Sequence, residues 1–146
     1  MKKYFYLIIF LVLIAGALIS LYFIYRPHKT KIKINNQIFN IEVVKSTYDI
    51  EKGLSGREKI ADNQGMLFEF KDYDIRNFWM KDMKFPLDIL FIDNEIIKEI
   101  TTLLKPENGT TPSYTSQNKV NYVLELNAGA INKYKISVGN TIEFIK

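Results

Sequence analysis

An uncharged apolar run near the N-terminus constrains this chain most strongly. Residues 4–25, YFYLIIFLVLIAGALISLYFIY, contain no charged side chain over 22 positions. A helix of about 20 apolar residues spans the hydrocarbon core of a bilayer, and aromatic residues at its ends suit the two interfaces. We therefore expect residues 4–25 to be a transmembrane anchor that contacts the lipid bilayer, behind a short basic N-terminus of residues 1–3.

A cleaved signal peptide is the competing interpretation of this run. Ala15, Gly16 and Ala17 are small residues of the kind found at cleavage sites. Cleavage there would leave residues 18–25 as an exposed apolar tail, which favours an uncleaved anchor. Two lysines precede the run and four basic residues follow it, so the positive-inside rule is divided. We expect a single-pass protein of the cell membrane, with its soluble domain on the extracytoplasmic side.

The net charge of +4 belongs to the membrane-proximal segment and not to the soluble part. Six of the 20 Lys and Arg residues precede Gln37 and no Asp or Glu does, so the 14 others stand against 16 acidic residues, a net charge of −2. Nucleic-acid-binding domains carry a basic face of their own. We therefore expect no nucleic-acid partner, and we expect residues 26–36, a basic stalk that includes the start of the first hairpin, to meet lipid headgroups.

The residue inventory excludes several kinds of chemistry. The chain has no Cys and a single His, His28, next to the apolar run. Disulfides, thiolate metal sites and cysteine nucleophiles are therefore excluded. Multi-His zinc sites and Ser-His-Asp triads in the soluble domain are excluded too, because both need an imidazole in a cleft. We expect no metal or cofactor, and any chemistry falls to carboxylates, Lys, Arg, Tyr and Ser.

Alternation of polar and apolar residues predicts one β-rich domain over residues 37–146. A hairpin is expected from residues 31–35 and 37–44, and further strands at residues 66–70, 77–80, 87–93, 95–104, 122–127 and 141–145. A short helix can begin at Ser46 or Thr47 and end at Gly53, and residues 128–134 can form one or two helical turns.

Two polar segments separate these elements. Residues 71–74 are expected as a turn and residues 105–117 as a long loop rich in Pro, Gly, Ser and Thr. Seven or eight short strands with one or two short helices predict a mainly β (α+β) domain. We expect a small barrel-like or rolled antiparallel or mixed sheet, preceded by one transmembrane helix.

Several ordered motifs resemble the prokaryotic family known as domain of unknown function 192. In chain order they are GLSGR at residues 53–57, GMLFEF at 65–70, FWMK at 78–81, PLDILFID at 86–93, YVLEL at 122–126 followed by Ala128 and Gly129, and VGN at 138–140. The resemblance covers residues 45–144, and the ordered set is more specific than any single motif. It implies a compact, mostly β domain, often behind a signal or anchor, and no established activity. Lys81-Asp82-Met83 departs from the family's usual Lys/Arg-Asn-Thr, so no hydroxyl role is implied at position 83.

Asp88 is the most unusual polar residue within the apolar strands. It shares a strand face with Leu90 and Ile92, where a carboxylate needs a partner. Arg57 is our first choice, because a guanidinium can bind a carboxylate with two hydrogen bonds. Such a pair fits a buried structural tie and a binding pocket equally well. Asp93, five positions further on, points to the opposite face of a regular strand and cannot form a close carboxylate pair with Asp88.

Four other residues complete the candidate set. Trp79 and Lys81 share one face of a strand. The simplest interpretation buries both faces of that strand, with Lys81 extending to an edge; the functional one makes Trp79 a stacking platform beside a cation. Glu125 lies among apolar strand residues, and Tyr114 lies in the long loop, where it is either solvated or offers its hydroxyl to a ligand.

The leading interpretation is a ligand-binding or accessory module at the cell envelope that takes a small anionic or sugar ligand. The candidate binding residues are Arg57, Trp79, Lys81, Asp88, Tyr114 and Glu125. One alternative is a hydrolase of envelope glycans or phosphoesters that uses Asp88 or Glu125 with Lys81. A second is a structural partner of another membrane protein, which predicts a broad exposed apolar patch. The sequence does not single out a catalytic residue.

Overall fold

The computed structural model describes residues 2–24 and 28–145, which form three helices and nine strands. The helices are α1 (Lys2–Ile24), α2 (Thr47–Lys52) and α3 (Ala130–Lys133). The strands are β1 (His28–Ile34), β2 (Gln37–Val44), β3 (Gln64–Asp74), β4 (Asn77–Trp79), β5 (Leu87–Asp93), β6 (Ile96–Leu103), β7 (Ser113–Thr115), β8 (Val120–Asn127) and β9 (Ile142–Ile145). The mainly β prediction is confirmed, with nine strands in place of seven or eight.

The strands differ from the prediction in three places. β3 continues to Asp74, so residues 71–74 are strand and not a polar turn. β7 lies inside the predicted loop of residues 105–117, where it pairs with β4. β1 begins at His28, so most of the predicted stalk is strand. Arg26 and Pro27 of that stalk, and Tyr25 at the end of the predicted anchor, lie outside the described residues.

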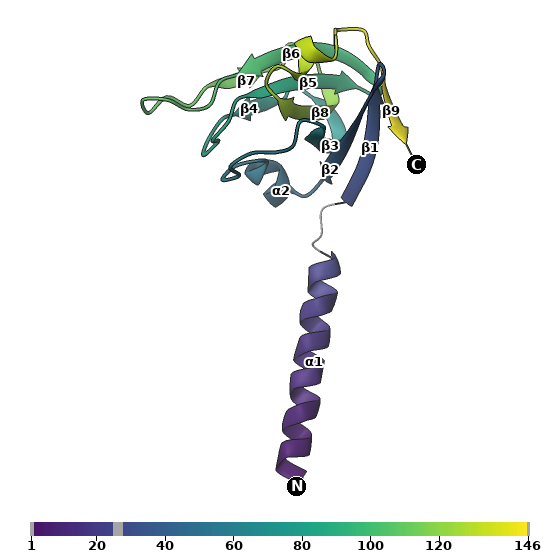
Figure 1. Ribbon diagram of the computed structural model, residues 1–146, viewed down its shortest axis with the longest axis vertical. Coiled ribbons are helices and arrows are strands. Elements are labelled where there is room, and N and C mark those ends of the chain that lie inside the picture. Colours follow the sequence, from purple (N-terminus) through teal and green to yellow (C-terminus); the bar gives the residue numbers. More distant parts are fainter. Residues whose placement is uncertain (1, 25–27, 146) are drawn as a thin grey trace.

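α1 is long and apolar enough to cross a membrane. Its stretch Tyr4–Leu21 is wholly unburied by the rest of the chain, and Figure 1 shows the helix apart from the sheet. A signal sequence near the N-terminus has the same length and composition. The membrane anchor therefore stays a prediction.

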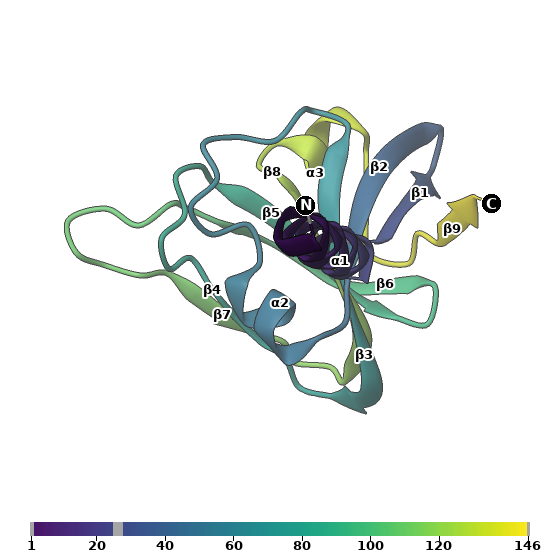
Figure 2. The ribbon, with the colours of Figure 1, turned by 90° about the horizontal axis from the view of Figure 1, so that it is seen from below.

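Seven of the strands form a single curled sheet in the order β6-β5-β8-β3-β2-β1-β9. Neighbouring strands are antiparallel except β2 and β3, which are parallel and are joined by a crossover that contains α2. The curl, visible in Figures 1 and 2, brings the edge strands toward each other. They meet at a bridge between Ile96 and Thr141, and the N–H of Ile142 donates to the carbonyl of Glu95 (2.8 Å). The curled sheet is a half-barrel whose two edges meet at this bridge.

The central strands β5 and β8, and the first half of β3, bury both of their faces. On β5, Leu90 and Ile92 pack in a cluster on the side of α3, whereas Ile89 and Phe91 pack in a second cluster on the side of β4. Figure 2 shows α2 and α3 over different parts of the sheet. Because successive residues of a strand point to opposite faces, each polar residue on these strands belongs to one cluster or the other.

Asp88 belongs to the α3 side and is almost completely buried. Its Oδ1 accepts a hydrogen bond from the Thr102 hydroxyl (2.6 Å), and its Oδ2 accepts one from the N–H of Ile131 in α3 (2.9 Å). Gly129, which precedes α3, has no side chain to cap the helix, so Asp88 satisfies this N–H from a neighbouring strand. The predicted Arg57–Asp88 pair is wrong, because the partners of Asp88 come from β6 and α3.

We expect Asp88→Ala to lower the free energy of unfolding by about 1–3 kcal/mol, because it removes the two hydrogen bonds that this buried carboxylate accepts from Thr102 and Ile131. Urea unfolding followed by circular dichroism measures the loss. Asp62→Ala is the matched control, since Asp62 binds Lys133 of the same helix (2.8 Å) from an exposed position, and it should change stability little. Equal losses in the two variants would contradict the capping role of Asp88.

Candidate functional site

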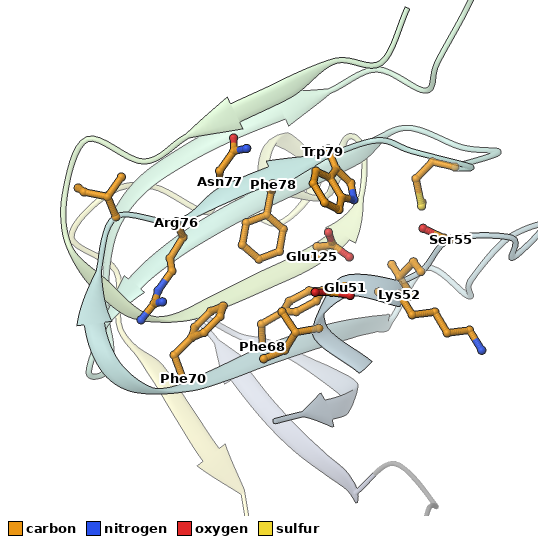
Figure 3. Close-up of a pocket in the computed structure, with 15 residues that line it drawn as sticks. Glu51, Lys52, Ser55, Phe68, Phe70, Arg76, Asn77, Phe78, Trp79 and Glu125 are labelled. Carbon is orange, nitrogen blue, oxygen red and sulfur yellow. The ribbon is translucent and has the colours of Figure 1, made fainter. Parts of the chain in front are cut away.

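A cavity of about 270 Å³ lies between α2, β3, β4 and β8. We call it the Glu125 cavity. Figure 3 shows aromatic rings and two carboxyl groups around it. Its lining residues are Ile50, Glu51, Lys52, Gly53, Leu54, Ser55, Phe68, Phe70, Ile75, Arg76, Asn77, Phe78, Trp79, Met83 and Glu125.

Aromatic side chains form much of the wall. The rings of Phe68 and Phe78 pack edge to face, with centroids 4.8 Å apart, and Phe70 carries the guanidinium of Arg76 over its ring (3.9 Å to the centroid). Trp79 is 49% exposed although it lines the same cavity. The interpretation of Trp79 as a core residue is therefore wrong. Its ring offers an accessible aromatic surface.

Glu125 brings a carboxyl group into this apolar surrounding. The side chain is only 4% exposed, and its Oε2 has no hydrogen-bond partner among the residues that the structure describes. Burial raises the pKa of Glu125 from 4.5 to about 8, against the opposing effect of the Arg57 charge. Glu125 is therefore mostly protonated at neutral pH, and its group can both donate and accept a hydrogen bond.

A close contact between strands holds Glu125 in place. Met66 of β3 is directly opposite Glu125 of β8, and Gly65 is opposite Leu126. A Cβ atom on Gly65 would lie 2.5 Å from the Glu125 carbonyl oxygen and 2.7 Å from the Leu126 side chain. Only glycine leaves room for this packing, which explains the glycine that opens the GMLFEF motif.

Arg57 lies near the cavity but binds another residue. Its two terminal nitrogens donate to the two carboxylate oxygens of Glu42, at 2.9 and 2.7 Å. These hydrogen bonds hold the pKa of Glu42 below its ordinary value and raise the pKa of Arg57. Arg57 thus affects Glu125 through its charge without pairing with it.

The structure brings together some of the predicted site residues and not others. Trp79 and Glu125 line the Glu125 cavity, whereas Lys81 does not. Asp88 is opposite Leu126, on the face of the sheet that Glu125 does not share. Tyr114 packs on Phe91, and its hydroxyl donates to Glu99 (3.4 Å). Whether any of these residues binds a ligand stays a prediction.

Glu51, Ser55 and Arg76 line the cavity although the sequence did not single them out as site residues. Glu51 lies on α2, a helix that the sequence predicts, and Ser55 lies in the GLSGR motif. A sequence feature at each of these two positions could therefore have pointed to the site. The hydroxyl of Ser55 donates to the carbonyl of Lys81 (2.9 Å) and ties that motif to the FWMK motif. Arg76 lies in none of the motifs and in no predicted helix or strand, so the sequence did not point to it. Within residues 2–24 and 28–145, no group of three metal-ligating side chains occurs.

The sequence profile of DUF192, a family described as "Uncharacterized ACR", matches residues 30–144. The chain belongs to the DUF192 family. A crystal structure of a Sinorhizobium meliloti 1021 protein, proposed as a transcription regulator, is 30% identical with a TM-score of 0.75, over 81% of this chain and 95% of that one. A protein of unknown function from Novosphingobium aromaticivorans DSM 12444 is 25% identical with a TM-score of 0.71, over 79% and 84%. Among curated proteins, none matches. The family match confirms the resemblance, and the two solved structures share the fold of this chain.

The raised pKa of Glu125 predicts that this DUF192 domain loses stability as pH rises. Between pH 4.5 and about 8 the folded protein keeps the Glu125 proton and the unfolded chain has released it. The contribution of Glu125 is therefore complete below pH 4.5 and falls by about 1.4 kcal/mol for each pH unit until the pH passes its folded pKa. Glu125→Gln removes this titration.

Urea unfolding at several pH values checks this prediction. The stability of the wild type relative to Glu125→Gln should decrease steadily across the window. Glu58→Gln, at an exposed position that binds Lys84 on the surface, is the control. A constant difference between the wild type and Glu125→Gln from pH 5 to 8 would show that the buried carboxyl group is ionised in the folded protein.

Proposed function

We propose that this protein is a membrane-anchored module that binds a small ligand in the Glu125 cavity, at the cell envelope. The observation that carries this proposal is that Glu125 lines an open cavity while its Oε2, shielded from solvent, has no hydrogen-bond partner within the described chain. A buried polar atom without a partner costs about 1–3 kcal/mol. A ligand that hydrogen-bonds to this atom removes that cost, so the site favours an occupant.

A comparison of the two buried carboxyl groups, one on each face of the sheet, supports this proposal. Asp88, the other buried carboxylate, uses both oxygens for hydrogen bonds within the domain. The Oε2 of Glu125 has no partner within the described chain, and Glu125 borders a cavity with an accessible Trp79. A cavity with apolar walls and a few convergent polar groups is the usual form of a small-molecule site.

The hydrolase alternative has less support from this arrangement. Of the residues that it was predicted to use, Glu125 lines the cavity and Asp88 and Lys81 do not. The role in transcription that is proposed for the Sinorhizobium protein is not carried over to this chain. From Gln37 onward the chain has a net charge of −2, whereas a DNA-binding domain needs a basic surface.

Ligand binding can be followed through Trp79, because it is the only Trp in the chain and it lines the cavity. We expect at least one small-molecule fraction of a cell-envelope extract to shift the emission of Trp79 in the full-length protein. Glu125→Ala should abolish the shift, because it removes the polar group of the cavity. Tyr48→Ala, an exposed position on α2 outside the lining, should leave it unchanged. The absence of a shift with every fraction would overturn the binding function.

The location of the domain is a separate part of the proposal. If α1 anchors the chain with its N-terminus in the cytoplasm, alkaline phosphatase fused after Lys146 should be active and a fused green fluorescent protein dark, because the first folds only after export. The fusion should keep the mass of the uncleaved chain and stay in the membrane fraction. The reverse pattern of activities would place the domain in the cytoplasm, and a shorter, released product would identify a cleaved signal peptide.

A further inference from the structure

We propose that the ligand of the Glu125 cavity is an uncharged sugar ring, one pyranose residue with its C–H face on the aromatic wall and its hydroxyl edge at Glu125. This inference rests on the proposed binding function and specifies its ligand class. Four properties of the cavity lead to it: size, aromatic surface, charge, and the hydrogen-bonding capacity of Glu125.

The volume of the cavity limits the enclosed part of the ligand to about one small ring. Pockets for drug-sized ligands usually enclose about 300–1,000 Å³, and the Glu125 cavity, at about 270 Å³, lies just below that range. An extended oligosaccharide or a nucleotide would not fit inside it. A single sugar residue, either free or at the end of a glycan, would.

The lining combines flat apolar surface with polar groups, as a sugar ring requires. Figure 3 shows the carboxyl group of Glu125 beside the Trp79 ring, with Phe78 and Phe68 around it. A pyranose ring presents weakly positive C–H groups on its face, which suit the negative face of an aromatic ring, and hydroxyl groups around its edge. A purely apolar ligand would leave Glu125 without a partner.

The charges around the cavity disfavour an anionic ligand. Both terminal nitrogens of Arg57 are bound to Glu42, and Arg76 is bound to Asp72 and packed on Phe70. Figure 3 shows the Lys52 side chain directed away from the cavity. An anion would therefore meet the carboxylate of Glu51 in the lining, where Arg76 is already bound to Asp72 and Lys52 is directed away.

A cationic ligand is disfavoured for a different reason. The positive charge of Arg57 acts on Glu125 and would repel a second cation there. Such a ligand would also have to remove the proton that Glu125 carries when the cavity is empty. An uncharged ligand has neither cost.

Protonated Glu125 can both donate a hydrogen bond to a hydroxyl group and accept one from it. The carboxylic acid donates one hydrogen bond and accepts another, and a sugar hydroxyl does the same. Oε2, which has no partner within the described chain, is then satisfied. Loss of the proton turns Glu125 into an acceptor only and removes the donated bond.

Titrations of the full-length protein followed by Trp79 emission test this inference. The probes are glucose, galactose and N-acetylglucosamine as uncharged sugars, choline as a cation and glucuronate as an anion, each at pH 6, 7.5 and 9. We expect at least one uncharged sugar to bind and to lose about tenfold in affinity between pH 6 and 9, because Glu125 ionises near pH 8. Glucuronate and choline should bind more weakly than that sugar at pH 6.

Glu125→Gln distinguishes the donor role of Glu125 from a structural one. The amide still donates a hydrogen bond but does not titrate, so sugar affinity should stay within a few-fold of the wild type and lose its decline above pH 8. Glu125→Ala should lose binding at every pH while its circular dichroism spectrum stays native. The exposed control Glu58→Gln should keep both the affinity and the pH dependence of the wild type.

The remaining outcomes separate the inference from the binding function on which it rests. Binding of choline that strengthens with pH, or a preference for glucuronate, would overturn the sugar class and leave the Glu125 cavity as a ligand site. Sugar binding that Glu125→Ala leaves intact would also overturn the inference. If none of the five probes shifts Trp79 emission while an envelope fraction does, the uncharged-sugar class is wrong and the binding function stands.

Discussion

The close contact between Gly65 and the backbone of Glu125 determines how the central strands β3 and β8 pack. It lets β3 and β8 approach without a side chain between them, and it fixes the register in which Met66 is opposite Glu125. Register decides which side chain faces which cluster, and a slip of one residue would exchange the two faces. Glu125 would then face the α3 side and Leu126 the cavity. The candidate site therefore depends on a glycine that contributes no chemistry of its own.

Two buried carboxyl groups on adjacent strands have different surroundings and, we infer, different roles. Asp88 is enclosed by donors from β6 and α3, so it links three elements and stabilises the fold. Glu125 has aromatic rings on its side of the sheet, and Arg57, whose charge acts on it, is bound to Glu42. Its Oε2 is left without a partner within the described chain. The same residue class thus serves structure on one face of the sheet and, in our proposal, recognition on the other.

The sequence predicted the β-rich fold well because strand alternation and turn residues are local signals. Asn35–Asn36 between two alternating runs marked the first hairpin, and Ser46 with Gly53 marked α2. Alternation also identified Asp88 and Glu125 as polar residues on apolar strands. It could not supply their partners, because the Ile131 N–H lies 43 positions from Asp88 in the chain. Likewise, the strand pattern of Trp79 did not reveal that β4 pairs only with the short β7, which leaves the ring half exposed.

The meeting of β6 with β9 would have a consequence if α1 anchors the protein in a membrane, as we propose. Free sheet edges are templates for pairing between molecules, and a half-barrel would ordinarily present two of them. Here Glu95 and Ile97 of the β6 side exchange backbone hydrogen bonds with residues 139–142, beside β9. Each edge thereby blocks part of the other. Copies confined to one bilayer meet far more often than copies in solution, so this mutual blocking would keep neighbouring domains from joining edge to edge into aggregates.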